Sequence, residues 1–177
     1  MDLSPAAATL AREIVLAYVA APAIGPGARE SWAALARGVR PLYQSVIARG
    51  ITPVVSSESY PDAAAMFQDL QRGNILVDGG YVSDYHPLLT NEQRTEFMVV
   101  HDVLAHEMRL SYVWEDEVRA YHNQAMMLVP EAAPAVFAEI VAHASSIALD
   151  GARCVPYKGL VMGEEMRKVH QMFGWAA

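Results

Sequence analysis

Apolar residues recur at three- and four-residue steps along most of the chain, the spacing typical of helices with one buried face. Proline, glycine and small polar residues interrupt this pattern at regular intervals and mark where helices begin and end. The pattern predicts a helix that begins after Thr90, together with six others at about 5–20, 28–49, 62–72, 114–129, 134–149 and 163–173.

Several of the predicted helices have clear start or break signals. Ser4-Pro5 combines an N-cap residue with proline at the first helical position. Thr90 and Gln93 have the spacing of a capping box, in which each side chain satisfies a backbone N–H group. Gly38 and Pro41 fall inside the second helix, so we expect a kink or a break there.

Two short segments, 51–55 and 75–77, are rich in Val and Ile and are predicted to be strands. Pro53 favours an edge position for the first, because proline cannot donate a hydrogen bond to a neighbouring strand. The expected fold is mainly α: a single-domain helical bundle over residues 1–177 with a minor two-stranded β element. The helices that carry the candidate chemistry span about 90–150.

Composition narrows the function classes. The formal net charge is −7 and the 13 Lys and Arg residues form no basic run, so we expect no nucleic-acid partner. No apolar run approaches the ~20 residues that span a bilayer, and no basic signal-peptide start is present, so we expect no membrane partner. Cys154 is the only cysteine, which excludes an internal disulfide and a Cys-rich zinc site and favours a cytoplasmic location. A small-molecule or peptide substrate is the expected partner, and the oligomeric state stays open.

The stretch 86–107 departs from the apolar pattern, because it places three His and several acidic residues among Val and Leu. Burying such groups costs free energy unless they are paired or bound to a metal. The helix after Thr90 offers His101, Asp102, His106 and Glu107. We therefore interpret this stretch as half of a metal site, with the other ligands on the two following helices.

The spacing of the two central histidines imposes a geometric condition. His101 and His106 are five residues apart, which is about 140° around an ideal helix. Both rings can reach one ion only if the helix contains a π-bulge or unwinds near His106. If the turn is regular, Asp102 and His106, four residues apart, are the aligned pair instead.

The remaining candidate ligands are Glu117 on one helix, and Glu139 and His143, which share a face, on the next. Imidazole and carboxylate ligands suit one divalent transition-metal ion, namely zinc, iron or manganese. Helical bundles hold such ions with Glu and His from facing helices. Glu107 or Glu139 would act as the general base.

The glycine- and tyrosine-rich segment 78–86 precedes the site helix and is predicted to be a loop. Tyr81, Tyr85 and His86 are the residues that we expect to line the cofactor- and substrate-binding pocket. Gly79 and Gly80 would let the loop close as a lid, although a plain turn explains them as well.

These motifs resemble a family of metallopeptidase-like proteins found largely in bacteriophage genomes. The similarity covers about residues 30–145 and rests on separated anchors: Tyr60-Pro61, Met66, Asp69, His86-Pro-Leu-Leu-Thr, Phe97, His101-Asp102, His106, Glu117, Ala120-Tyr121, Met127, Pro130 and Glu139. The chain is similar to a divergent member, because Ala105 replaces a family Gly, Val118 a Glu and Gln124 a His. The resemblance implies a hydrolase that acts on peptides.

Four functions are compatible with these residues. The leading one is a metal-dependent hydrolase, although the usual zinc-protease motif His-Glu-x-x-His is missing, so peptidase activity rests on the resemblance alone. The second is an iron-dependent oxygenase or oxidase in a helical bundle. The third is a metal phosphohydrolase with His86 and Asp150 as outlying ligands. The fourth is no enzyme but a phage structural or interaction domain, in which the polar cluster is a hydrogen-bonded network.

Overall fold

The computed structural model describes residues 3–106, 110–151 and 157–175. Within these ranges the fold is mainly helical with one small two-stranded sheet, as the sequence predicted. Its elements are α1 (Pro5–Ala20), α2 (Ala28–Ala48), β1 (Thr52–Ser56), α3 (Ala63–Gln71), β2 (Asn74–Asp78), α4 (Gly79–Ser83), α5 (Asn91–Val100), a π-helix (His101–Ala105), α6 (Trp114–Met126), a 3₁₀ turn (Pro130–Ala132), α7 (Ala133–Asp150) and α8 (Gly163–Phe173).

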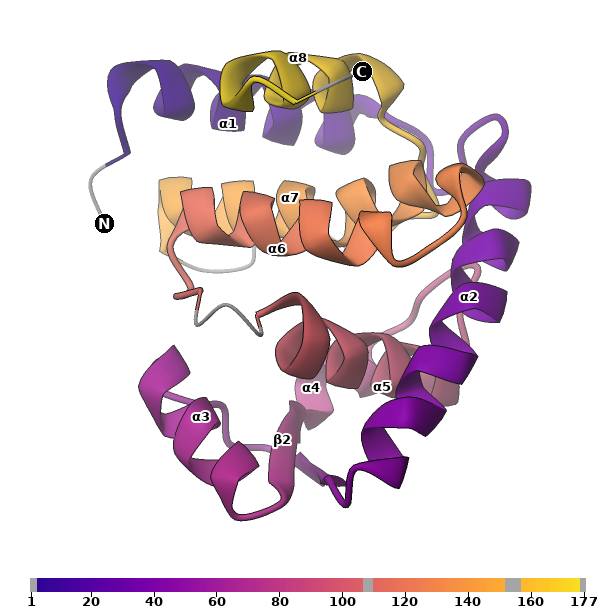
Figure 1. The fold of residues 1–177 in the computed structure, drawn as a ribbon. Helices are drawn as coiled ribbons and strands as arrows, with labels where there is room; N and C mark the ends of the chain where they lie inside the picture. The colour runs from indigo at the N-terminus through magenta and orange to yellow at the C-terminus, as the bar shows by residue number, and fades with distance from the viewer. Residues whose placement is uncertain (1–2, 107–109, 152–156, 176–177) are drawn as a thin grey trace.

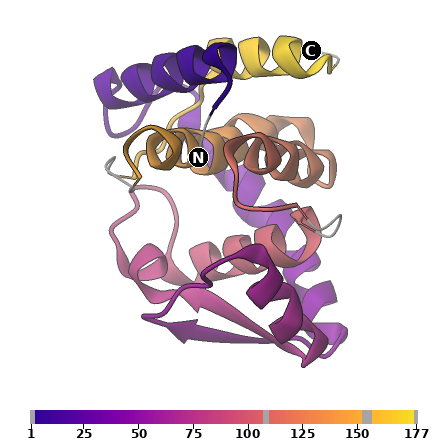
Figure 2. The same ribbon diagram turned by 90° about the vertical axis from the view of Figure 1, so that its left-hand side faces the viewer.

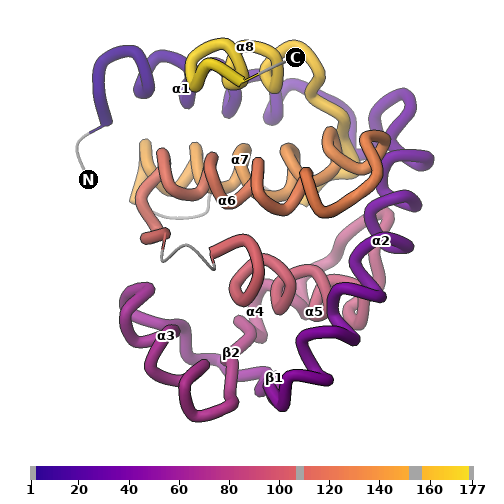
Figure 3. The backbone as a smooth tube through the Cα atoms, in the orientation of Figure 1, coloured from indigo at the N-terminus to yellow at the C-terminus, as the bar shows by residue number. Residues whose placement is uncertain are grey.

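The helices lie in layers. α1 and α8 form the upper layer of Figure 1, α6 and α7 lie side by side beneath them, and α5 lies below these with the small sheet and α3. Figure 2 shows the same layers edge-on, and Figure 3 shows α2 running along one side from the upper layers to β1. This stacking places the end of α5 directly beneath α6, which brings the predicted site helices together.

α7 is the central element of the bundle, because it packs against α1, α2 and α6. Its sequence is apolar around almost the whole helix, which is the pattern of a buried helix. The expectation that no apolar run approaches the length of a membrane span is wrong for one segment. Of the described residues, Pro130–Asp150 alone is long and apolar enough to cross a membrane, and 67% of its most apolar window is buried inside the protein. A core helix has the same composition, so this segment fits its place in the fold.

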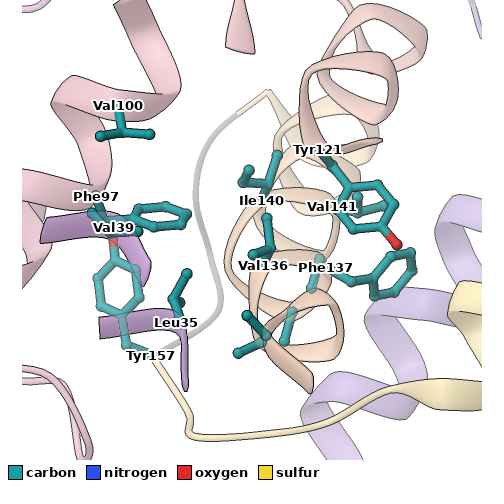
Figure 4. Packing of buried hydrophobic residues seen from close by; sticks show 14 of the residues in the cluster. Leu35, Val39, Phe97, Val100, Tyr121, Val136, Phe137, Ile140, Val141 and Tyr157 are labelled. Atoms are coloured by element: carbon teal, nitrogen blue, oxygen red, sulfur yellow. The ribbon is translucent and has the colours of Figure 1, made fainter. Parts of the chain in front are cut away.

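The core joins the layers through side chains of α2, α5, α6 and α7 (Figure 4). Leu35 and Val39 of α2 lie near Phe97 of α5, and Tyr121 of α6 meets Phe137 of α7 edge-on at 5.3 Å between ring centroids. All five side chains are at most 2% exposed, so the helices are held in fixed positions around the site.

α2 continues from Ala28 to Ala48 without a break at Gly38 and Pro41, where a kink or a break was predicted. A proline removes one helical hydrogen bond, and here packing along the remaining turns outweighs that loss. Gly38 has a packing role instead. A Cβ added at this position would lie 2.7 Å from Leu128 Cδ2, so glycine lets the chain after α6 approach α2 closely.

The strands β1 and β2 pair in parallel, with α3 as the connection between them. The segment after β2 is not a plain loop as predicted, because residues Gly79–Ser83 form the short helix α4, capped by the side chain of Asp78. A Cβ at Gly79 would lie 2.9 Å from the carbonyl oxygen of Ser56. Gly79 is therefore required for close packing of α4 against β1.

Candidate metal centre

A π-helical turn follows α5 at the position where the histidine spacing demanded one. The backbone N–H of His106 donates to the carbonyl oxygen of His101, five residues earlier, at 3.2 Å. The wider turn brings both imidazole rings to the same side of the helix, and their centroids lie 4.7 Å apart. The prediction of a distorted turn between the two histidines is confirmed.

Three ligand-type atoms converge beside this turn. Nε2 of His101 lies 3.1 Å from Nε2 of His106 and 3.2 Å from Oε2 of Glu117. The third side of the triangle, from His106 Nε2 to the same carboxylate oxygen, measures 3.8 Å. Ligands bound at about 2.0–2.2 Å to one tetrahedral ion lie about 3.3–3.6 Å apart. The triangle therefore has the size of one metal coordination site.

The second nitrogen of each ring fixes the direction of the first. His106 Nδ1 lies 3.1 Å from the carbonyl oxygen of Leu110, which can only accept, so this nitrogen carries the proton. His101 Nδ1 lies 3.2 Å from Oε1 of Gln124, which favours the same tautomer. Both Nε2 lone pairs then point at one another across 3.1 Å. They repel unless a proton or a metal ion lies between them.

Asp102 adds a second carboxylate to this cluster. Ligand atoms of His101, Asp102 and His106 lie within 4.8 Å of one another, so this buried group could hold a metal ion. Burial raises the pKa of the Asp102 carboxyl to about 6, although the two neighbouring rings favour its charged form. From the sequence, Asp102 was the expected partner of His106 only for a regular turn, but beside the π-helical turn it lies together with both histidines.

The charges of the cluster are strongly coupled. Burial by itself would raise the pKa of Glu117, but its contacts with His101 and His106 lower that pKa to about 2. Burial likewise opposes charge on His106, yet the contact with Glu117 raises the pKa of that ring. The cluster therefore holds a carboxylate and favours a positive charge next to it.

A cavity of about 330 Å³ lies next to the triad of His101, His106 and Glu117. Polar side chains from five elements of the fold line it, together with apolar ones from α5 and α7. The lining residues whose side chains can bind a metal or transfer a proton include Tyr81, His101, Asp102, Glu117, Glu139 and His143. The cavity thus connects the candidate metal centre with the two residues predicted on α7.

Glu139 belongs to a second buried group. Its Oε1 accepts a hydrogen bond from the Tyr81 hydroxyl at 2.5 Å, and its Oε2 lies 3.8 Å from His86 Nε2. The guanidinium of Arg94 lies between the rings of Tyr81 and Tyr157, 4.1 and 3.9 Å from their centroids. The contacts with Tyr81 and His86 hold the Glu139 carboxylate at the wall of the cavity.

His143 lies one turn further along α7, where its Nε2 is 3.4 Å from the Tyr18 hydroxyl and its ring packs at 4.6 Å from that of Tyr157. The structure therefore brings together His101, His106 and Glu117 of the five predicted ligands. Glu139 and His143 line the same cavity, where Glu139 accepts a hydrogen bond from Tyr81 and His143 packs against Tyr157.

The three predicted pocket residues of the segment 78–86 lie in different surroundings. Tyr81 lines the cavity, but Tyr85 is 82% exposed and is not one of the lining residues. His86 is buried against Trp32 at 4.4 Å, and its Nδ1 accepts hydrogen bonds from the backbone of Leu88 and Leu89. Burial lowers the pKa of His86 to about 3, so this ring is a neutral structural element.

Three residues near the triad remain to be placed. Glu107, predicted as a general base, lies outside the described residues. Gln124, which stands where the resembled family has a His, contacts His101 Nδ1, and this contact was not predicted. Asn123 also supports the site, because its side-chain amide donates to the carbonyl oxygen of Ala105 at the end of the π-helix, at 3.0 Å.

Comparison with models of known protein families, with curated proteins and with solved structures found no match.

Proposed function

We propose that the protein is a metal-dependent hydrolase that holds one divalent transition-metal ion between His101, His106 and Glu117. The observation that supports this proposal is the convergence of two ring nitrogens and one carboxylate oxygen, 3.1, 3.2 and 3.8 Å apart. Two His and one Glu form a ligand set of catalytic zinc sites, which keep a fourth position open for water. Structural zinc sites use four protein ligands instead.

A bound ion of this type would lower the pKa of water at the open position to about 7, which makes hydroxide available at neutral pH. The protein's own residues complete the site. Gln124 and the Leu110 carbonyl orient the two rings through their Nδ1–H groups, as supporting residues do in metal sites. Asp102 and Glu139 line the cavity and are the carboxylates available to accept a proton.

An iron-dependent oxygenase is the second candidate, and one observation favours it. Two His and one carboxylate with open positions are also the ligand set of non-haem Fe(II) oxygenases. The metal-phosphohydrolase alternative has less support, because His86 is fixed by backbone N–H groups and Asp150 lies exposed at the end of α7.

Metal analysis separates these functions. We expect protein purified without added metal to contain close to one transition-metal ion per chain by mass spectrometry. The metal-free protein should regain a single zinc ion in calorimetric titration, and with it hydrolysis of amino-acyl p-nitroanilides or apolar p-nitrophenyl esters. Iron in place of zinc, with dioxygen-dependent turnover, would favour the oxygenase instead.

The variants His101→Ala, His106→Ala and Glu117→Gln should each weaken zinc binding by at least 100-fold. His122→Ala is the matched control, because this histidine lies on α6 and stacks on Trp175, away from the cavity. If no transition metal binds, or if the control loses metal as the triad variants do, the cluster is a hydrogen-bonded network and the proposal is wrong.

A further inference from the structure

The cavity beside the triad has a closed end and an open end. His101, Asp102 and Glu139 are each at most 8% exposed and form its inner end. Glu58 and Ile147, by contrast, are exposed lining residues and mark its mouth. A molecule in the cavity would therefore have one end at the triad and the other at the surface.

The wall between the two ends is mainly apolar. Ile140, Ala144 and Ala148 of α7 are four residues apart and share one face of the helix, which forms one side of the cavity. Phe97 and Met98 of α5 line it as well. The cavity is lined mainly by apolar surface, with the hydroxyls of Tyr60, Tyr81 and Tyr112 at a few points, so it favours a ligand with an apolar body.

The lining of the cavity is rich in acidic side chains. Five carboxyl side chains contribute to it, and none of its described residues is a Lys or Arg; the acids are Glu58, Asp78, Asp102, Glu117 and Glu139. A divalent ion would add two positive charges, which five carboxyl groups still outnumber. Phosphate recognition in proteins relies on Arg, Lys or helix N-termini, so this lining opposes a phosphate ester.

From this lining we infer that the cavity takes an uncharged or cationic substrate with an apolar body, namely an amide or ester of an apolar acid, and excludes phosphate esters and other anions. The inference rests on the proposed function, because the ion would hold the carbonyl group at the inner end. Hydrolysis of such an amide forms a C–O bond from water and breaks the C–N bond. It yields an acid and an amine, with the second water proton transferred to the leaving amine.

The size of the cavity limits the apolar body. At about 30 Å³ per water- or methylene-sized group, 330 Å³ accommodates about eleven such groups. An acyl chain of six carbons therefore fits inside with its head group at the triad, and longer chains would extend through the mouth.

Metal-binding probes of graded length test the inference. The zinc-loaded protein would be titrated calorimetrically with acetohydroxamic, butanohydroxamic and hexanohydroxamic acid, which are uncharged at neutral pH, and with hexylphosphonate. We expect the affinity of the hydroxamic acids to rise about fourfold per added methylene. Hexylphosphonate should bind at least tenfold more weakly than hexanohydroxamic acid.

Two variants place the effect in the cavity. Ala144→Leu should leave zinc affinity unchanged and abolish the dependence on chain length, because the larger side chain fills the apolar wall. Ala33→Leu, the same substitution at an exposed position of α2, should keep that dependence. If the protein binds zinc but the three hydroxamic acids bind it with equal affinity, this inference alone is overturned. The same holds if hexylphosphonate binds as tightly as hexanohydroxamic acid. A protein that takes up no zinc would overturn the proposed function and this inference together.

Discussion

The hydrogen bond between His101 Nδ1 and Gln124 Oε1 should control metal affinity without controlling the fold. Gln124→Met keeps the length of this fully buried side chain and removes its strong acceptor. In the metal-bound protein His101 must keep its proton on Nδ1, because Nε2 holds the ion. In the metal-free protein the proton can move to Nε2, where Glu117 lies 3.2 Å away. The substitution therefore penalises the bound state selectively.

The size of this effect follows from the burial of the donor. A buried N–H group left without an acceptor costs about 1–3 kcal/mol, which weakens binding by about 5- to 150-fold. Loss of a supporting hydrogen bond to a metal-bound His typically costs 10- to 100-fold, in the same range. At free zinc about 100 times the parent Kd, zinc adds about 2.7 kcal/mol of stability; a 30-fold weaker Kd would leave about 0.9 kcal/mol.

The assay is a zinc titration against a chromophoric chelator, combined with thermal unfolding with and without zinc. For a chain of this size, the zinc-induced rise in Tm should shrink by about 4–7 °C in Gln124→Met. Gln124→Glu supplies a carboxylate acceptor and should restore parent affinity. Gln44→Met, at an exposed position of α2, is the matched control and should behave as the parent.

Parent zinc affinity in Gln124→Met would refute the reasoning, because His101 could then bind the ion without a fixed tautomer. So would an equal loss of Tm in the metal-free and zinc-loaded variant, which would mean that Gln124 supports packing and not the ligand.

Two further predictions concern stability. The pKa of His86 is about 3 in the folded protein and about 6.5 in the unfolded chain, so the folded state binds fewer protons between these values and loses stability as the pH falls from 6.5. Between pH 7.5 and 4.5 this should lower the free energy of unfolding by about 2–3 kcal/mol, and His86→Asn should reduce that difference in urea titrations; an unchanged pH dependence would contradict the assignment. Gly79→Ala should destabilise the protein by about 1–3 kcal/mol, because its Cβ would meet the Ser56 carbonyl oxygen at 2.9 Å. Gly163→Ala, where an added Cβ meets nothing within 4 Å, should be neutral or stabilising, and equal melting of the two variants would refute the packing argument.

Local signals in the sequence predicted most helix ends, because capping is decided by residues a few positions apart. The Thr90–Gln93 capping box and the Ser4–Pro5 start both form as expected. The distorted turn was also predictable, since two ligands five residues apart cannot share a face of a regular helix.

Features that depend on contacts distant in sequence were not predictable in this way. Continuity of α2 through Pro41 is decided by packing against several other elements, and the parallel direction of the sheet follows from how α3 folds back. The position of the Glu139 carboxylate depends on its hydrogen bond from Tyr81, 58 residues earlier. Helical spacing could place Glu139 and His143 on one face but could not choose their partners.

The π-helix has a consequence for how the site could be gained or lost. Its hydrogen bonds join residues five apart and not four, so the alignment of the two rings depends on the number of residues between them. A chain one residue shorter between His101 and His106 would align both rings on an ordinary helix. The five-residue spacing instead places a fixed irregularity at the end of α5, held by the Asn123 amide on α6. Deletion of one residue between the two histidines would therefore convert the π-helical centre into one on a regular helix, and an insertion would reverse the change. Neither replaces a ligand.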